Sequence, residues 1–239
     1  MNQKKKKKSY LVGFAILLAS MGYFVDIYDL LLFSIVRIPS LKSLGFVGQS
    51  LMDRGIFLLN IQMIGLLIGG IFWGILGDKK GRLHVLFGSI FLYSIANIAN
   101  GFVHTIESYA VWRFIAGIGL AGELGAGITL VAEIMPKEKR GYATTIVAAV
   151  GVSGAVAGFF VSEFFDWRTS FFIVGGLGLA LLLLRIGIAE SDIDADCEAV
   201  LGCSTFGGRR NRSDIIIYNF TFVYQVTVVV DQAKTRLIE

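Results

Sequence analysis

The sequence contains few charged residues. Asp, Glu, Lys and Arg together make up 17% of its 239 residues, whereas a soluble globular chain carries about 25%. Apolar residues make up 55% of the chain, and the mean hydropathy is +0.70. This deficit of charge argues against an ordinary soluble domain.

Cysteine is also scarce. The two cysteines, Cys197 and Cys203, lie near the C-terminus, and no histidine stands near them in the chain. This pattern excludes a disulfide framework and argues against a metal site. No pairing of a nucleophile with a base indicates catalysis, so we expect neither enzyme activity nor a cofactor.

Long apolar runs dominate what the sequence does contain. They are about twenty residues long, which is the length that a helix needs to cross about 30 Å of hydrocarbon. We therefore predict an all-α integral membrane protein with six transmembrane helices, in contact with the lipid bilayer. The predicted spans are Tyr10–Val36, Ile56–Leu76, Leu83–Val103, Tyr109–Met135, Tyr142–Phe160 and Thr169–Ile188.

The first apolar run follows five lysines, Lys4 to Lys8, an order that signal peptides share. The segment Ala19–Met21 makes a poor cleavage site, and apolar character resumes after Asp29 and continues to Val36. We therefore predict that the first run is an uncleaved membrane helix.

Most basic residues lie in short clusters between the apolar runs, so the net charge of +4 does not indicate nucleic-acid binding. The clusters Lys4–Lys8, Lys79–Arg82 and Lys137–Arg140 alternate along the chain with loops poorer in basic residues. Cytoplasmic loops carry the excess of lysine and arginine. We predict a multi-pass protein of the plasma membrane, the inner membrane in a bacterial cell, with a cytoplasmic N-terminus and the segment around Lys42 outside.

Small residues recur four positions apart within the spans, which allows helix backbones to approach closely in lipid. One such stretch, Gly117–Gly122, spells the dinucleotide fingerprint, but that fingerprint requires a strand before an exposed turn. We therefore interpret these residues as helix-packing positions. They are Gly65 with Gly69, Gly70 with Gly74, Gly117 with Ala121 and Gly125, and Gly154 with Gly158.

Charged residues inside the predicted spans are functional candidates, because a charge in the bilayer is costly without a partner or a cavity. Asp26 and Asp29 share one helix face, and Asp26 lies about 24 Å from the cytoplasmic surface at the standard helical rise. Arg113 enters about 6–8 Å from the outer surface, at a matching depth. We predict an aspartate–arginine pair between the first and fourth spans, serving either proton coupling or structure, and take Glu123 as a further proton or substrate group.

The segment between the second and third spans resembles the cytoplasmic loop signature of the major facilitator superfamily. That signature is a glycine, three residues, an aspartate, a basic residue, any residue, a glycine and a basic residue. Its further basic residue is absent, because Leu83 occupies the position. The matching residues are Gly74, Asp78, Lys79, Gly81 and Arg82.

Other segments resemble the metabolite and sugar branches of the same superfamily, and the resemblance covers about residues 9–190. The fifth span has Gly154-Ala155 where drug antiporters have Gly-Pro, which disfavours the drug-antiporter branch. The matching segments are Asp26–Leu30, Arg113 with the glycines up to Glu123, Ala132–Pro136 with Arg140-Gly141, and Trp167-Arg168.

The resemblance implies half of a twelve-helix fold, built from two inverted three-helix repeats. It also implies secondary active transport of a small polar metabolite, an organic acid or sugar-like, coupled to protons through alternating access. Substrate and protons would use Asp26, Asp29, Arg113 and Glu123. A cytoplasmic gate would use the loop signature, in which Asp78 pairs with basic groups and Glu133 pairs with Arg82 or Arg140.

The competing interpretation is a non-transporting six-helix membrane protein or scaffold, since a partner C-terminal half would be needed to complete the cavity. We divide the chain into a basic terminus (1–9), a six-helix half-domain (10–190) and an atypical tail (191–239). Within the tail, Ile215–Val230 alternates with period two, which is typical of a strand. We expect a frameshift or premature junction near Glu190 rather than a native tail.

Overall fold

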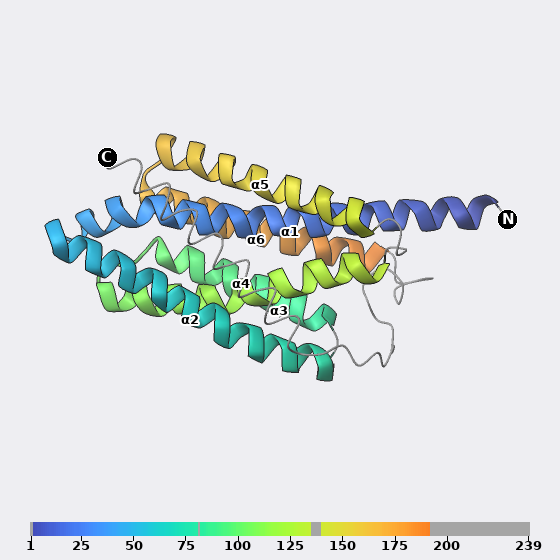
Figure 1. Cartoon of the computed structure of the whole chain (residues 1–239), viewed down its shortest axis with the longest axis horizontal. Coiled ribbons are helices and arrows are strands. Elements are labelled where there is room, and N and C mark those ends of the chain that lie inside the picture. Colours follow the sequence, from blue (N-terminus) through green and yellow to red (C-terminus); the bar gives the residue numbers. More distant parts are fainter. Residues whose placement is uncertain (1, 81, 135–139, 192–239) are drawn as a thin grey trace.

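The computed structural model describes residues 2–80, 82–134 and 140–191 (Figure 1). Every regular element in this part of the chain is a helix, which confirms the all-α prediction. The helices are α1 (Asn2–Ser43), α2 (Gly48–Lys80), α3 (Arg82–Asn100), α4 (Ile106–Ile134), α5 (Arg140–Phe164) and α6 (Trp167–Ser191). Each predicted span overlaps one of these helices, although Leu83–Val103 runs past the end of α3 at Asn100. The strand predicted in the tail lies outside the described residues.

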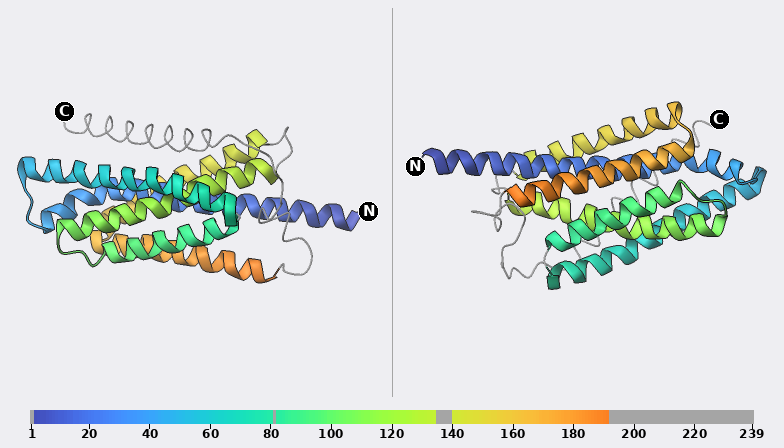
Figure 2. Two further views of the ribbon diagram at one scale, coloured as in Figure 1. Left: turned by 90° about the horizontal axis from the view of Figure 1, so that it is seen from below. Right: turned by 180° about the vertical axis from the view of Figure 1, so that it is seen from behind.

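The short connection between α1 and α2 contains one glycine, Gly45, and is followed by a second, Gly48, at the start of α2. Gly45 and Gly48 have φ angles of 89° and 59°, a region that side chains other than glycine rarely enter. The amide of Phe46 donates to the carbonyl of Leu41 at 3.1 Å. This turn reverses the chain, so that α2 runs back beside the other helices (Figures 1 and 2).

The helices lie roughly along one long axis as a bundle (Figure 2). α1 packs mainly on α5, α2 packs mainly on α4, and α3 packs on both α4 and α6. α1 also contacts α4 and α6. Side chains from α1, α3, α4 and α6 therefore meet in the middle of the bundle.

The closest helix approaches use the predicted small residues. A methyl group at Gly65 or Gly117 would collide with backbone of the facing helix, at Phe114 and Gln62 respectively, and one at Gly69 would lie 2.6 Å from the Ile118 carbonyl oxygen. The α2–α4 crossing therefore depends on glycine at these positions. The α1–α5 crossing resembles it, because a methyl group at Gly154 would collide with the Phe24 carbonyl oxygen, and one at Gly158 would lie 3.2 Å from that of Tyr28.

The expectation for Gly70 and Gly74 is wrong within the described residues. A methyl group at either position would meet no atom within 4 Å. The physical reason is helical geometry, since each residue turns the side-chain direction by about 100°. Gly70 therefore points away from the face on which Gly69 meets α4.

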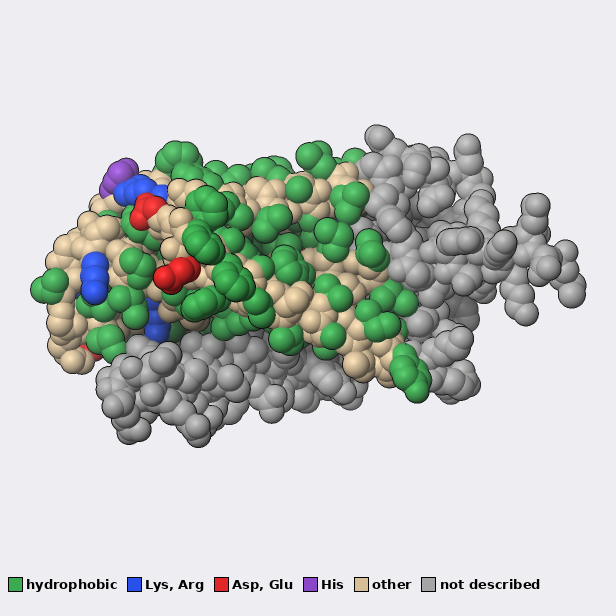
Figure 3. Space-filling view, turned by 90° about the horizontal axis from the view of Figure 1, so that it is seen from above, with side chains coloured by type: hydrophobic (Ala, Val, Ile, Leu, Met, Phe, Trp, Pro, Cys, Tyr) green, Lys and Arg blue, Asp and Glu red, His purple; other side chains and the backbone are tan. Residues whose placement is uncertain are grey.

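The outer surface of the bundle is apolar. Three of the described helical segments have the length and hydropathy to cross a membrane, namely Gly48–Lys79, Gly141–Phe164 and Trp167–Ile186. Large side chains such as Phe72 and Phe159 are exposed. Figure 3 shows hydrophobic side chains over the described surface, with charged ones gathered toward one end. A soluble monomer rarely exposes so much contiguous apolar surface, whereas a lipid bilayer accommodates it.

Candidate functional site

The predicted aspartate–arginine pair joins α1 to α4. Arg113 Nη1 lies 3.6 Å from Asp29 Oδ1, and both side chains are fully buried. Neither carboxylate oxygen of Asp29 has a hydrogen-bond partner among the described residues. The structure contains an aspartate–arginine contact between α1 and α4, and Asp29 is the partner rather than Asp26; its depth in the bilayer and its role in coupling stay predictions. The separation exceeds the 2.7–2.9 Å or so of a charge-assisted hydrogen bond, so the contact is a loose one.

Arg113 itself is firmly held by groups other than Asp29. Its Nη2 donates to Asn97 Oδ1 at 2.6 Å. Its guanidinium carbon lies 4.3 Å from the ring centre of Phe33 and 4.7 Å from that of Phe171. These aromatic rings attract the cation through their faces. Contacts from α1, α3 and α6 thus fix the arginine of α4 in place.

A second buried ion pair joins α4 to α6. Arg185 donates from Nη1 to Glu123 Oε2 at 3.0 Å and from Nη2 to Oε1 at 2.6 Å. Such two-point pairing is the strongest geometry available to an arginine and a carboxylate. Glu123 is therefore engaged by a residue that the sequence analysis missed. The signal was present, since Arg185 is a single charge inside the apolar run Leu181–Ile186, where a charge is costly.

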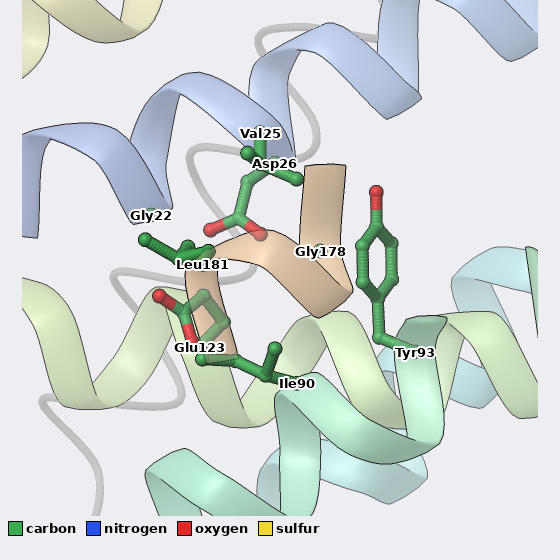
Figure 4. A pocket seen from close by; sticks show the side chains of 8 residues that line it. All are labelled: Gly22, Val25, Asp26, Ile90, Tyr93, Glu123, Gly178 and Leu181. Carbon is green, nitrogen blue, oxygen red and sulfur yellow. The ribbon is translucent and has the colours of Figure 1, made fainter. Parts of the chain in front are cut away.

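Asp26 lies beside this second pair. A cavity of about 10 Å³ lies between α1, α3, α4 and α6 at this level. It has room for about one water molecule. Figure 4 shows Asp26 of α1 directed toward Glu123 of α4. Asp26 is 2% exposed, and its Oδ2 has no hydrogen-bond partner among the described residues. The lining residues are Gly22, Val25, Asp26, Ile90, Tyr93, Glu123, Gly178 and Leu181.

The bundle therefore holds charged groups at two levels. Arg113 and Glu123 are ten residues apart on α4 (123 minus 113), or about 15 Å at the standard rise. Asp29 belongs to the first level and Asp26 to the second. The sequence analysis placed the two aspartates on one helix face. In the structure they have different neighbours, since Asp29 lies beside Arg113 and Asp26 lies beside Glu123.

The predicted cytoplasmic gate is described only in part. Gly74, Asp78 and Lys79 lie in the last turns of α2, where the side chains of Asp78 and Lys79 are exposed. Gly81 lies outside the described residues. The side chains of Arg82, Glu133 and Arg140 lie outside them too, so the pairing of Glu133 with Arg82 or Arg140 stays a prediction.

Comparison with known proteins identifies the family of the chain. A sequence model described as Major Facilitator Superfamily matches residues 12–195. The chain is 31% identical over 188 residues to the sialic acid transporter NanX of Escherichia coli, covering 74% of this chain and 43% of NanX. It is 26% identical over 196 residues to the benzoate transport protein of Acinetobacter baylyi, covering 75% of this chain and 39% of that protein.

Among solved structures, the proton:xylose symporter XylE bound to 6-bromo-6-deoxy-D-glucose matches with a TM-score of 0.68. At 17% identity it covers 94% of this chain and 53% of the symporter, a likeness of fold alone. The chain spans less than half the length of NanX and of the benzoate transport protein. Both relatives are named for transport, which agrees with the expectation that the chain is not an enzyme. With its apolar helices and the family match over most of its length, this chain is an integral membrane protein that belongs to the major facilitator superfamily.

Proposed function

We propose that this chain is part of a secondary active transporter that moves a small organic acid together with protons by alternating access. The observation that carries the proposal is the buried pair between Asp29 of α1 and Arg113 of α4. The relatives named for sialic acid and benzoate favour an organic acid over a sugar, because both of those solutes are acids. The xylose symporter resembles the chain in fold alone.

The physical basis for proton coupling is the isolation of the Asp29 carboxylate. Its oxygens lack hydrogen bonds among the described residues, so the nearby guanidinium of Arg113 is the group that favours its ionised form. When α1 moves away from α4, the carboxylate loses this support. An unpaired charge in a buried site is costly and is relieved by protonation. Movement of α1 against α4 would therefore bind or release a proton at Asp29.

Alternating access requires that this movement open one side of the bundle at a time. The basic clusters favour a cytoplasmic N-terminus in the inner membrane. The loop signature at Gly74–Arg82, together with Glu133 and Arg140, would then form the cytoplasmic gate. Glycine-rich crossings of α1 with α5 and of α2 with α4 provide smooth contact surfaces for such motion.

A second candidate function is a non-transporting six-helix membrane protein. The chain spans less than half the length of the curated relatives described above, so the activity of a whole transporter is a proposal for this chain. The cavity of a twelve-helix transporter lies at the interface of its repeats, so a second half is proposed as the partner of this chain.

The test is proton flux in proteoliposomes that contain the chain and a trapped pH-sensitive dye. An external pulse of benzoate should acidify the lumen faster than in protein-free vesicles of the same lipid. Asp29→Asn should abolish this protein-dependent acidification. Asp53→Asn is the matched control, because Asp53 is an exposed aspartate of α2 and should transport as the parent chain does.

Two outcomes would contradict the proposal. Flux that is unchanged by Asp29→Asn would remove Asp29 from the coupling mechanism. Absence of flux above the protein-free background, both for the chain alone and for the chain reconstituted together with the C-terminal half of NanX, would favour the non-transporting candidate.

A further inference from the structure

The two buried arginine pairs differ in what else surrounds the guanidinium. Arg113 is fully buried, contacts the rings of Phe33 and Phe171 and donates to Asn97. With these contacts and no exposed surface, its guanidinium offers a solute no approach in this arrangement. Arg185 instead presents two N–H groups to the side chain of Glu123, and Glu123 lines a cavity. A carboxylate already occupies the place where a carboxylate ligand would bind.

The groups around Glu123 carry more acid than base. Among the described residues, it is faced by Asp26 from α1, Tyr93 from α3 and Arg185 from α6. Tyr23, one turn before Asp26, lies against Gly151 of α5. Asp26 thus lies on the same cavity as a carboxylate that Arg185 already binds. The side chain of Asp26 is 2% exposed and points toward Glu123 across the cavity (Figure 4). Its Oδ2 has no hydrogen-bond partner among the described residues.

We propose that Arg185 binds the carboxylate of the transported solute, and that Glu123 occupies this position when no solute is present. The inference rests on the proposed function, because it names the group that the solute must carry and the residue that receives it. The site is separate from the Asp29–Arg113 pair and lies about 15 Å farther along α4.

The exchange balances in charge and in protons. The solute carboxylate accepts the two N–H···O hydrogen bonds that Arg185 now donates to Glu123. Glu123, without its cation and with Asp26 nearby, takes a proton from water on the open side, because like charges in a buried site disfavour each other. One anion and one proton enter together, so the net charge of the site is unchanged. Any proton carried by Asp29 is additional to this one.

The geometry explains why exchange, rather than simple addition, is required. The cavity of about 10 Å³ holds about one water molecule, so it has no room for a solute carboxylate beside that of Glu123. α1 covers the pair through Gly22, at which a methyl group would collide with Glu123 Oε1 and lie 2.8 Å from Arg185 Nη2. Displacement of Glu123 therefore requires α1 to move, the same motion that the Asp29–Arg113 pair would sense.

The test measures binding of benzoate to the purified full chain in detergent micelles, by calorimetry in two buffers of different ionisation enthalpy. Benzamide, the neutral amide of the same shape, is the control ligand. The parent chain should bind benzoate with uptake of about one proton and should not bind benzamide. Glu123→Gln removes the competing carboxylate, so benzoate should bind about tenfold more tightly at neutral pH, without proton uptake.

Removing Arg185 alone would leave Glu123 buried without its cation, which destabilises a fold. The double variant Glu123→Gln with Arg185→Gln keeps a neutral, hydrogen-bonding pair and differs from Glu123→Gln only at residue 185. It should lose benzoate binding. Equal binding by these two variants would overturn the proposal, as would unchanged affinity and proton uptake in Glu123→Gln, or failure of the parent chain to prefer benzoate to benzamide.

The Asp29→Asn variant distinguishes this inference from the proposed function. It should still bind benzoate with proton uptake at Glu123. It should carry no flux in proteoliposomes, because the movement of α1 against α4 that completes transport depends on the Asp29–Arg113 pair. Benzoate binding that depends on Arg185 in a chain without flux would contradict the proposed function and support this site. Flux that depends on Asp29, together with benzoate binding that does not depend on Arg185, would support the proposed function and contradict this site.

Discussion

At a buried position in this bundle, the shape of the charged group matters as well as the sign of its charge. Arg113 combines a donated bond to Asn97 with ring contacts on Phe33 and Phe171. A planar guanidinium satisfies all three at once, whereas the ammonium of lysine is a compact point charge. Arg113 therefore acts as a fixed countercharge for Asp29.

We accordingly expect Arg113→Lys to lower the free energy of unfolding by about 1.5–3 kcal/mol, the range for a hydrogen bond to a charged group. Thermal unfolding in detergent micelles measures this loss. Arg54→Lys, on the exposed face of α2, makes the same exchange where no such contacts exist and should leave the unfolding midpoint unchanged. Equal midpoints for the two variants would show that the aromatic contacts and the Asn97 bond do not stabilise the fold.

The site could be predicted from the sequence only in part, and the reason lies in these side-chain contacts. The cost of charge in a bilayer marked Asp26, Asp29, Arg113 and Glu123, and matching depth predicted an ion pair between α1 and α4. Helical spacing does not rank two aspartates on one face, so the choice of Asp29 required the structure. Arg185 was missed, although the rule that marked the others applies to it.

At the scale of helices, the crossing of α2 over α4 concentrates two kinds of contact at one level. Gly69 brings the α2 backbone against Ile118, and Trp73 Nε1 donates to the Ile118 carbonyl oxygen at 2.7 Å. The indole thus anchors the helices one turn from the glycine. Close approach and a directional bond together fix the register of α2 on α4.

Two neighbouring glycines test this crossing. A methyl group in Gly69→Ala would lie 2.6 Å from the Ile118 carbonyl oxygen and 2.7 Å from its Cα, so the helices must separate at a cost of about 1–3 kcal/mol. Gly70→Ala meets nothing within 4 Å and should gain about 0.5–1 kcal/mol from helix propensity. The free energy of unfolding in detergent should therefore fall for Gly69→Ala and rise for Gly70→Ala. A shift of the same sign and size in both would contradict the packing of this crossing.

The presence of each helix could be predicted because a run of about twenty apolar residues matches the thickness of the bilayer hydrocarbon. Helix ends were less predictable: the first span was predicted over Tyr10–Val36, whereas α1 runs over Asn2–Ser43. Hydropathy marks the part of a helix that matches the hydrocarbon, and the backbone continues its hydrogen bonding into the interfaces. Pairing between helices was not predicted beyond α1 with α4, because small residues mark a close approach without naming its partner.

At the scale of the whole molecule, the orientation in the membrane is the remaining prediction. Lysine and arginine resist transfer to the outer side, and the clusters Lys4–Lys8 and Lys79–Arg82 alternate with less basic connections. The end of α1 that carries Lys42 should therefore face outward, and the end of α2 should face the cytoplasm. We expect a membrane-impermeant maleimide, added to intact cells, to label Lys42→Cys and not Lys79→Cys, in a background where Cys197 and Cys203 are replaced by serine. Both positions are exposed in the bundle, so the contrast reports the side of the membrane rather than burial.

After the cells are permeabilised, Lys79→Cys should label as fully as Lys42→Cys does. Labelling of Lys79→Cys in intact cells would invert the topology and, with it, the side from which Asp29 and Glu123 would take up protons in the proposed mechanism.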